Sequence, residues 1–207
     1  MLSLSKKQLS YVFIIFLIVG AVGMITNYNT YFEGLSFYNL LLTFTLLLFS
    51  VKFNPIFIKI LTSLFLIGFT AEVIGVHTNL LFGNYSYVKN LGPKILDVPV
   101  MIGINWAVLS FGAWSIVKDL KFNNILKFGL AAFIMVLFDI VMEPVAIELD
   151  FWNWNLDQIP ALNYITWFLI SYIQMIVISK SKIKNFGISR VIIFGQFIFF
   201  SWLLIWI

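Results

Sequence analysis

The sequence predicts an all-α membrane protein, a polytopic bundle of about seven transmembrane helices in one integral membrane domain over residues 1–207. Three observations lead to this prediction. Hydrophobic residues make up 61% of the chain and charged residues 11%, and the mean hydropathy is +1.00. A water-soluble domain of this size needs more polar surface. Apolar stretches of about 20 residues, the length that crosses a hydrocarbon core, recur with only short connections.

The apolar stretches predict the helices in order. The predicted spans are residues 10–26, 35–51, 56–76, 98–117, 125–147, 161–179 and 191–206. Lys6 and Lys7 precede the first stretch as in a secretory signal peptide, but the small-residue cleavage pattern is missing and further spans follow. We therefore expect the first stretch to remain as the first helix.

The basic residues predict the orientation of the bundle. Of the 13 Lys and Arg residues, only Lys89 and Lys94 fall on the outer side when the N-terminus is placed in the cytoplasm. The inner side then holds Lys6, Lys7, Lys52, Lys59, Lys118, Lys121, Lys127, Lys180, Lys182, Lys184 and Arg190. Because short cytoplasmic loops are enriched in Lys and Arg, this distribution predicts an N-in, C-out protein.

Composition also removes several classes of function. The chain has no cysteine, which excludes disulfides, thiolate metal sites, cysteine nucleophiles and sulfur-ligated haem or iron–sulfur clusters. His77 is the one histidine, and we expect no metal site. The last span lacks a lysine, which argues against a retinal Schiff base. The net charge of +4 fits anionic lipid headgroups, and we see no nucleic-acid signal.

Three carboxyl side chains stand out inside the predicted spans: Glu72, Asp139 and Glu143. An ionisable residue at the centre of a span costs about 2.5–3.5 kcal/mol on insertion scales. Lys59 and Lys127 also lie inside spans, but near inner ends where a lysine extends to the interface. The carboxyl groups are too deep for that explanation, so they are either hydrogen-bonded packing residues or functional groups.

The depths of these acids favour a common layer. At about 1.5 Å per residue, Glu72 lies about 24 Å, Asp139 about 21 Å and Glu143 about 27 Å from the inner ends of their spans. Asn105, about 10 Å below the outer end of its span, reaches a similar depth. Asp139 and Glu143 are four residues apart on one helix face, so at least one should be protonated and able to donate a proton. Pro144 should free backbone groups beside them.

The two long outer connections carry further candidates. Asp97 is either the N-cap of the next helix or a catalytic group. His77 is either a loop hydrogen-bonding residue or a proton-transfer group. Four tryptophans serve either as an interfacial belt or as the lining of a site for a long apolar ligand. These are Trp106, Trp152, Trp154 and Trp167.

These residues form two blocks of unusual composition. The first reads EVIGVHT over residues 72–78 and FGNYSY over 82–87, then has Leu91-Gly92-Pro93, Val98-Pro99 and Trp106. The second contains Asp139, Glu143-Pro144, Trp152, Trp154, Pro160, Asn163-Tyr164 and Trp167. Their order and spacing resemble the carotenoid biosynthesis membrane-protein family, which includes carotenoid 1,2-hydratases such as γ-carotene and bisanhydrobacterioruberin hydratases. Asn79 and Thr166 stand where that family often has glycine, which bears on substrate fit.

The resemblance implies addition of water across the terminal C1=C2 double bond of an acyclic or monocyclic carotenoid. Such a reaction needs an acid for C-2, a site that tolerates a cation at C-1, and a base that orients water. We assign Asp139 as acid, Glu143 as its partner and Glu72 as base. His77, Asp97 and Asn105 are secondary candidates. The expected substrate-binding residues are Trp106, Trp152, Trp154, Asn163, Trp167, Tyr85 and Tyr87.

The resemblance implies no nucleotide, flavin or metal cofactor. The expected partners are the carotenoid, membrane lipid and other enzymes of the pathway, in a bacterial inner membrane. Two alternatives stay open. One is a carotenoid cyclase or prenyl-adding enzyme. Cyclisation would start with the same protonation, but an internal double bond would then capture the cation in place of water. A proton-coupled transporter would use intramembrane acids as a relay, although no inverted repeat is visible.

Overall fold

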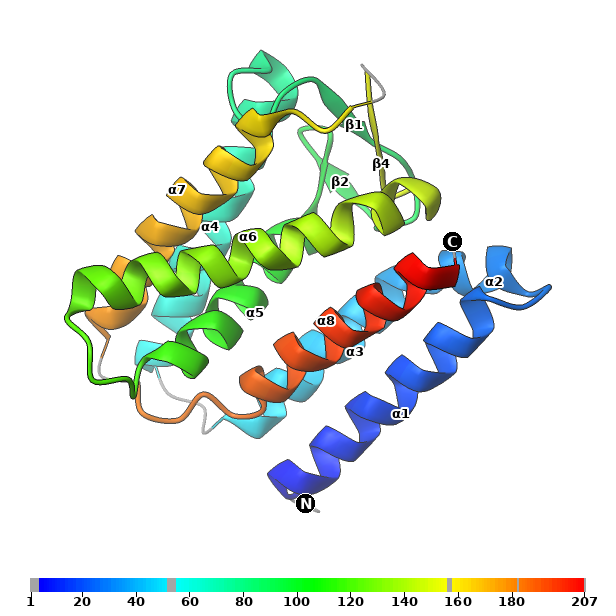
Figure 1. Cartoon of the computed structure of the whole chain (residues 1–207). Coiled ribbons are helices and arrows are strands. Elements are labelled where there is room, and N and C mark those ends of the chain that lie inside the picture. The colour runs from blue at the N-terminus through cyan, green and yellow to red at the C-terminus, as the bar shows by residue number, and fades with distance from the viewer. Residues whose placement is uncertain (1–3, 52–54, 156–157, 182, 207) are drawn as a thin grey trace.

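The computed structural model describes residues 4–51, 55–155, 158–181 and 183–206 (Figure 1). The helices are α1 (Lys6–Met24), α2 (Asn29–Gly34), α3 (Ser36–Ser50), α4 (Pro55–Thr78), α5 (Val100–Val117), α6 (Asn124–Glu148), α7 (Ala161–Ser179) and α8 (Ser189–Trp206). The strands are β1 (Tyr85–Tyr87), β2 (Lys94–Ile95), β3 (Val98–Pro99) and β4 (Trp152–Trp154).

Six of the predicted spans are confirmed as helices that are long and apolar enough to cross a membrane: α1, α4, α5, α6, α7 and α8. The predicted span 35–51 forms α3, which has only 15 residues. That is shorter than the roughly 20 residues a spanning helix needs. The count of seven therefore stays a prediction for this one segment.

Local sequence sets where several helices begin. Ser5 caps α1 in a capping box, in which its hydroxyl accepts from the Gln8 backbone and the Gln8 side chain accepts from the Ser5 backbone. Asn123 caps α6 by accepting from the Leu126 N–H. Pro99 precedes α5 in an extended conformation, so the N-cap role predicted for Asp97 is wrong.

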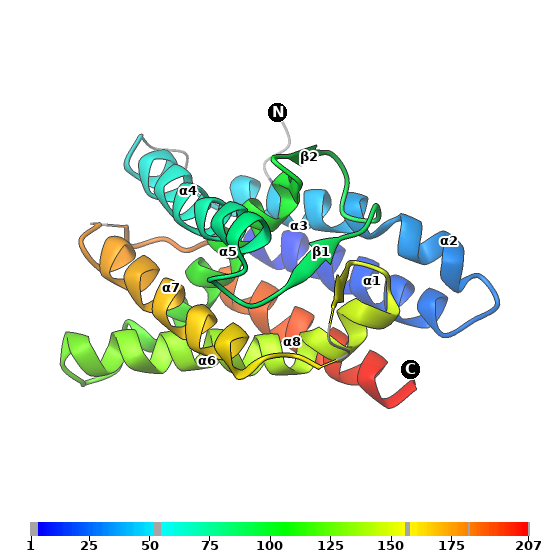
Figure 2. The ribbon, with the colours of Figure 1, turned by 90° about the horizontal axis from the view of Figure 1, so that it is seen from above.

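Helix α5 is the centre of the bundle. It packs against α3, α4, α6, α7 and α8, and α1 lies at one side against α3 and α8 (Figure 2). Small residues on α5 allow the close approach: Gly112 faces Ile193 of α8, and Gly103 faces Phe65 and Phe69 of α4. Small residues at helix contacts are typical of membrane bundles, where close packing replaces the hydrophobic effect.

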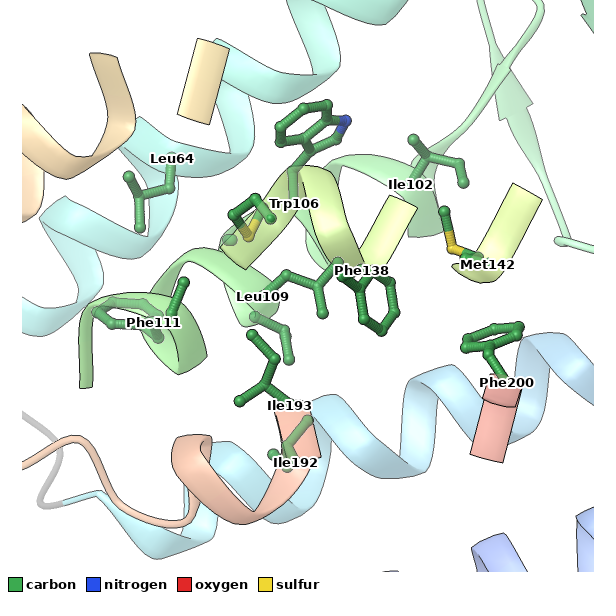
Figure 3. Close-up of a cluster of buried hydrophobic side chains, with 14 of the residues drawn as sticks. Leu64, Ile102, Trp106, Leu109, Phe111, Phe138, Met142, Ile192, Ile193 and Phe200 are labelled. Carbon is green, nitrogen blue, oxygen red and sulfur yellow. The ribbon is translucent and has the colours of Figure 1, made fainter. Parts of the chain in front are cut away.

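Large apolar side chains fill the space between α5, α6 and α8 (Figure 3). Phe138 and Met142 of α6 extend toward Phe200 of α8, and the Phe138 and Phe200 rings meet edge to face with centroids 5.7 Å apart. Edge-to-face contact is a favourable geometry for two aromatic rings. This contact fixes the C-terminal half of α8 against the helix that carries Asp139 and Glu143.

A buried polar network joins three helices deeper in the bundle. Gln174 of α7 accepts a hydrogen bond from the Ser110 hydroxyl of α5 (2.5 Å) and donates one to the Leu64 carbonyl of α4 (2.9 Å). Both polar atoms of the Gln174 side chain are therefore bonded to neighbouring helices of the bundle. Such a satisfied amide holds helices together in an apolar medium and needs no ligand.

The connections gather at two opposite ends of the molecule (Figure 1). At one end, Lys6 Nζ donates to Asn185 Oδ1 (2.5 Å) and the Ile188 N–H donates to Ser50 Oγ (3.0 Å). These bonds bring the start of α1, the end of α3 and the α7–α8 connection together. Most of the predicted inner-side lysines lie at this end, although Lys52 and Lys182 fall outside the described residues.

The opposite end carries four short strands, which corrects the all-helical prediction. β1 pairs antiparallel with β4, in the register Tyr85 to Trp154 and Tyr87 to Trp152, and β2 pairs antiparallel with β3. In β1 and β4 the aromatic residues face inward and the central Ser86 and Asn153 face outward. This alternation with period two is the strand pattern that the sequence Tyr-Ser-Tyr and Trp-Asn-Trp contains.

The orientation of the bundle is a testable prediction. A reporter fused after Trp154 should report the outside of the cell, and one fused after Lys184 the inside, because the lysine-rich end should face the cytoplasm. Paired alkaline phosphatase and green fluorescent protein fusions would measure both positions. The reverse pattern would place the strand-bearing end in the cytoplasm and contradict the N-in arrangement.

The packing of α4 on α5 gives a second prediction. A Cβ on Gly68 would approach Trp106 Cβ and Cγ to 2.5 Å, whereas one on Gly129 would have nothing within 4 Å. Gly68→Ala should therefore lower the free energy of unfolding by about 1–3 kcal/mol through overpacking. Gly129→Ala is the matched control and should be neutral or stabilising, because alanine favours a helix. Thermal unfolding in detergent, followed by tryptophan fluorescence, would contradict this if both variants matched the unmutated protein.

Candidate functional site

A cavity that is partly open to the surroundings lies between the helices below the β1–β4 sheet. Its wall is mainly aromatic and aliphatic. The polar residues in the wall, beyond the two tyrosines of β1, are Ser36, Asn39, Thr43, Glu72, Asn105, Glu143, Asn163 and Gln196. A largely apolar cavity with a few convergent polar groups is the usual form of a small-molecule site.

Glu72 lies on α4 at the edge of this cavity and is only 4% exposed. Its Oε2 accepts from the Tyr85 hydroxyl (2.5 Å) and the Tyr87 hydroxyl (2.7 Å), and its Oε1 accepts from Trp106 Nε1 (2.8 Å). Burial, and then the neighbouring Glu72 charge, raise the pKa of both tyrosines above the ordinary phenol value. The phenols therefore keep their protons and act as donors, an arrangement that suits an ionised Glu72.

Glu143 lies on α6, which continues through Pro144 without a break. Its Oε2 accepts from Trp152 Nε1 (3.0 Å) and Trp154 Nε1 (2.9 Å). Its Oε1 accepts a longer bond from Asn163 Nδ2 (3.3 Å). An indole N–H can only donate, so both tryptophans present a donor to this carboxyl group.

Asp139 lies one turn before Glu143 and has no exposed surface. Its Oδ2 accepts from Asn163 Nδ2 (2.7 Å), while its Oδ1 has no hydrogen-bond partner among the described residues. Asp139 is also absent from the cavity wall. Asn163, predicted as a substrate-binding residue, lines the cavity and bridges the two carboxyl groups.

The β1–β4 sheet brings donors to both glutamates at once. Tyr85 contacts Trp154 with ring centroids 5.2 Å apart, and Tyr87 meets Trp152 edge to face at 5.9 Å. The tyrosines of β1 serve Glu72 and the tryptophans of β4 serve the other glutamate. Cross-strand pairing therefore fixes the positions of the two carboxyl groups relative to the same four rings.

A second aromatic surface comes from the helices. Trp106 of α5 stacks on Trp167 of α7, with ring centroids 4.0 Å apart and the planes 24° apart. Both rings are buried and both line the cavity, as do Trp152 and Trp154. All four tryptophans singled out in the sequence therefore lie in the wall of this cavity.

The secondary candidates divide between the cavity and the surface. Asn105 lines the cavity. His77 and Asp97 lie outside it, where His77 Nε2 is 3.8 Å from an exposed Asp97 carboxylate oxygen and 3.3 Å from the Leu96 carbonyl oxygen. Leu96 and Asp97 have positive φ in the turn between β2 and β3. This turn directs the Asp97 side chain to the surface, away from the buried acids.

Two departures from the family pattern have local explanations. Asn79 has a φ of 57°, in the left-handed region that glycine adopts freely and that asparagine tolerates better than most residues. Thr166 accepts a hydrogen bond at Oγ1 from the Phe82 N–H (3.4 Å). Asn79 thus adopts a conformation close to that of a glycine, and Thr166 holds the backbone at Phe82, which lines the cavity.

Sequence reasoning missed the polar residues on α3 and α8. Ser36, Asn39 and Thr43 follow one another at intervals of three and four residues, which places them on one helix face. They line the cavity together with Gln196 of α8. The spacing is a usable signal, but short polar residues are common in membrane helices, so it does not single out a site by itself.

Comparison with known proteins identifies the family of the chain. The family model described as carotenoid biosynthesis protein matches residues 34–205. A curated relative, the bisanhydrobacterioruberin hydratase of Haloarcula japonica, is 29% identical over 140 residues, which cover 63% of this chain and 45% of that protein. The match thus spans less than half the length of that relative. No solved structure matches the chain. Since the family model covers most of the sequence, including every residue of the cavity wall that carries a carboxyl group, the chain belongs to the carotenoid biosynthesis protein family.

Proposed function

We propose that this protein is a carotenoid hydratase, a hydro-lyase that adds water to the terminal C1=C2 double bond of an acyclic or monocyclic carotenoid. The observation that carries the proposal is a pair of buried carboxyl groups, Glu72 and Glu143, on the aromatic wall of one cavity. The relatedness to a protein named as a hydratase supports the same reaction class.

The reaction requires a proton, a cation and a water molecule in sequence. A carboxylic acid gives its proton to C-2, and the two electrons of the double bond form the new C–H bond. A tertiary cation remains at C-1. The oxygen of water then bonds to C-1, and the extra proton of that water passes to a base, so the product is a tertiary alcohol and no redox step occurs.

The hydrogen bonds suggest which carboxyl group carries the first proton. Glu72 and Glu143 each accept from three donors, whereas Asp139 has one donor and an unpaired Oδ1. A buried ionised oxygen without a donor is costly, so the Asp139–Glu143 pair should hold a proton. Asp139, the acid assigned from the sequence, does not border the cavity, whereas its partner Glu143 does. We therefore propose, in place of that assignment, that Glu143 delivers the proton of this pair to C-2 and that Asp139 acts through Glu143.

The remaining steps use the other side of the cavity. The stacked rings of Trp106 and Trp167 present aromatic faces, which attract a nearby cation. Glu72, held by Tyr85 and Tyr87, is the proposed base that orients water and receives its proton. These roles keep the acid and the base on two different helices, α6 and α4.

A carotenoid partitions into lipid, so we propose that the substrate reaches the cavity from the bilayer of the cell membrane. Membrane lipid and other carotenoid-pathway enzymes are the proposed partners, and no cofactor takes part in the proposed steps. The carboxyl groups would also serve a cyclase, which makes the same cation. Product mass separates the two, because cyclisation gives an isomer of the substrate.

Hydration is tested by expression in bacteria that make lycopene or γ-carotene. The cells should accumulate a more polar pigment that is heavier by one water and has an unchanged visible spectrum, because the conjugated system is not touched. Growth in ¹⁸O-labelled water should place the label in the new hydroxyl, and purified protein should remain active after exhaustive chelation. A product isomeric with its substrate would identify a cyclase instead.

The roles of the paired acids are tested by amide substitution. Glu143→Gln should reduce hydration at least a hundredfold, in the range that a general acid contributes. Asp139→Asn should also lower activity and should change the pH–rate profile, because one of the two carboxyl groups that share the proton is removed. Product formation at several pH values would be measured by chromatography.

Glu148→Gln is the matched control, since Glu148 is exposed on the same helix and should leave activity unchanged. Size-exclusion chromatography and thermal unfolding would confirm that each variant is folded. Normal hydration by a folded Glu143→Gln protein would refute the proposed acid. An unaltered pH–rate profile for Asp139→Asn would leave Asp139 with a packing role only.

A further inference from the structure

The cavity has a second polar region that the proposed reaction steps leave unused. Ser36, Asn39 and Thr43 of α3 and Gln196 of α8 all line it. The proposed acid and base belong to other helices, α6 and α4. The wall therefore carries polar groups on two sets of helices, α3 and α8 on the one hand and α4 and α6 on the other.

Two atoms of this region lack hydrogen-bond partners. Ser36 Oγ and Gln196 Oε1 are buried and unpaired among the described residues, and each side chain belongs to a residue that is 5% exposed. A buried polar atom without a partner destabilises a protein, so an apolar residue at either position would fit the empty cavity better. By contrast, the amide oxygen and nitrogen of the buried Gln174 are hydrogen-bonded to α5 and α4, respectively. The unpaired atoms are therefore poor packing groups and suitable ligand-binding groups.

The chemistry of this region defines what it can bind. None of its four side chains carries a charge, so it offers nothing specific to a phosphate, a carboxylate or an ammonium group. Gln196 Oε1 is an acceptor and needs a donor from the ligand. Thr43 Oγ1 already donates to the Asn39 carbonyl (2.9 Å), which leaves it as an acceptor as well. The complementary group is an uncharged O–H.

We propose that Gln196, in a cavity wall that also carries Ser36, Asn39 and Thr43, is the acceptor of a second subsite that binds an uncharged hydroxyl group. This inference rests on the proposed function, which supplies two sources for that group. One is a water molecule held for the reaction, and the other is a hydroxyl already present on the carotenoid. Both present the same O–H to Gln196 Oε1.

The test compares Gln196→Leu and Ser36→Ala in the full-length protein in lipid nanodiscs. Lycopene and its 1-hydroxy derivative are the two probes, and quenching of the cavity tryptophans reports their binding. If the subsite binds a ligand hydroxyl, Gln196→Leu should weaken binding of the hydroxylated pigment about tenfold, the value for one ordinary hydrogen bond, and leave lycopene binding unchanged.

If the subsite holds water, both pigments should bind as before. The rate of hydration at saturating pigment should then fall for both, with more isomerised by-product from the uncaptured cation. In either case Gln196→Leu should unfold at the same or a higher temperature than the unmutated protein, because it removes an unpaired polar atom. Unchanged binding and unchanged hydration in both variants would overturn the subsite, as would a lower unfolding temperature without any ligand-dependent effect.

Ser171→Ala is the matched control. Ser171 is buried and its hydroxyl is also unpaired among the described residues, but it does not border the cavity, so its removal should change neither binding nor turnover. The binding measurement needs no catalysis. If the unmutated protein formed no hydrated product but its preference for the hydroxylated pigment disappeared in Gln196→Leu, hydration would be refuted and the subsite would stand.

Discussion

The site depends on the need of buried carboxyl groups for hydrogen-bond donors. An ionised carboxylate in an apolar bundle is stable only when donors replace the water it has lost. Here the side-chain donors to Glu72 and to Oε2 of Glu143 are phenol and indole groups, from Tyr85, Tyr87, Trp106, Trp152 and Trp154. Because every one of these donors is attached to an aromatic ring, satisfying the acids also builds an aromatic wall around them. One set of residues thus meets the electrostatic requirement and provides the surface that a cation needs.

The short β1–β4 sheet makes that arrangement precise. Its inward rings depend on register, since a shift by one residue would turn all four toward the outside. Bonds beyond the ladder hold the register: the Val88 N–H donates to the Phe151 carbonyl (3.0 Å), and the Asn155 N–H donates to the Asn84 carbonyl (3.1 Å). Asn90 Nδ2 also donates to the Leu149 carbonyl (3.0 Å). The connections at this end are therefore part of the site, while the helices below supply the acids.

The sequence allowed the bundle and the acids to be predicted because both follow from transfer energies. A stretch of about 20 apolar residues must be buried or span lipid. A carboxyl group within such a stretch is costly, so its presence indicates a hydrogen-bonding or functional role. The strands escaped prediction because three residues give too short a pattern, although Tyr85, Tyr87, Trp152 and Trp154 alternate as strands require. Depth alone also could not distinguish Asp139, behind Asn163, from the acids at the cavity wall.

Unpaired polar atoms carry information that residue type does not. Gln174 and Gln196 are the same residue type, both buried in helices, and the sequence offers no means to rank them. The oxygen and the nitrogen of the Gln174 amide each have a hydrogen-bond partner, on α5 and on α4, so this amide contributes to packing. Gln196 Oε1 is unpaired in a cavity wall, a state that lipid cannot relieve and that a ligand can. The lone unpaired oxygen of Asp139 follows the same logic with a different remedy, because a carboxyl group can relieve it by taking up a proton. In this bundle, an unpaired polar atom in the cavity wall therefore marks a place that can bind a ligand, and an unpaired carboxyl oxygen marks a place that can take up a proton.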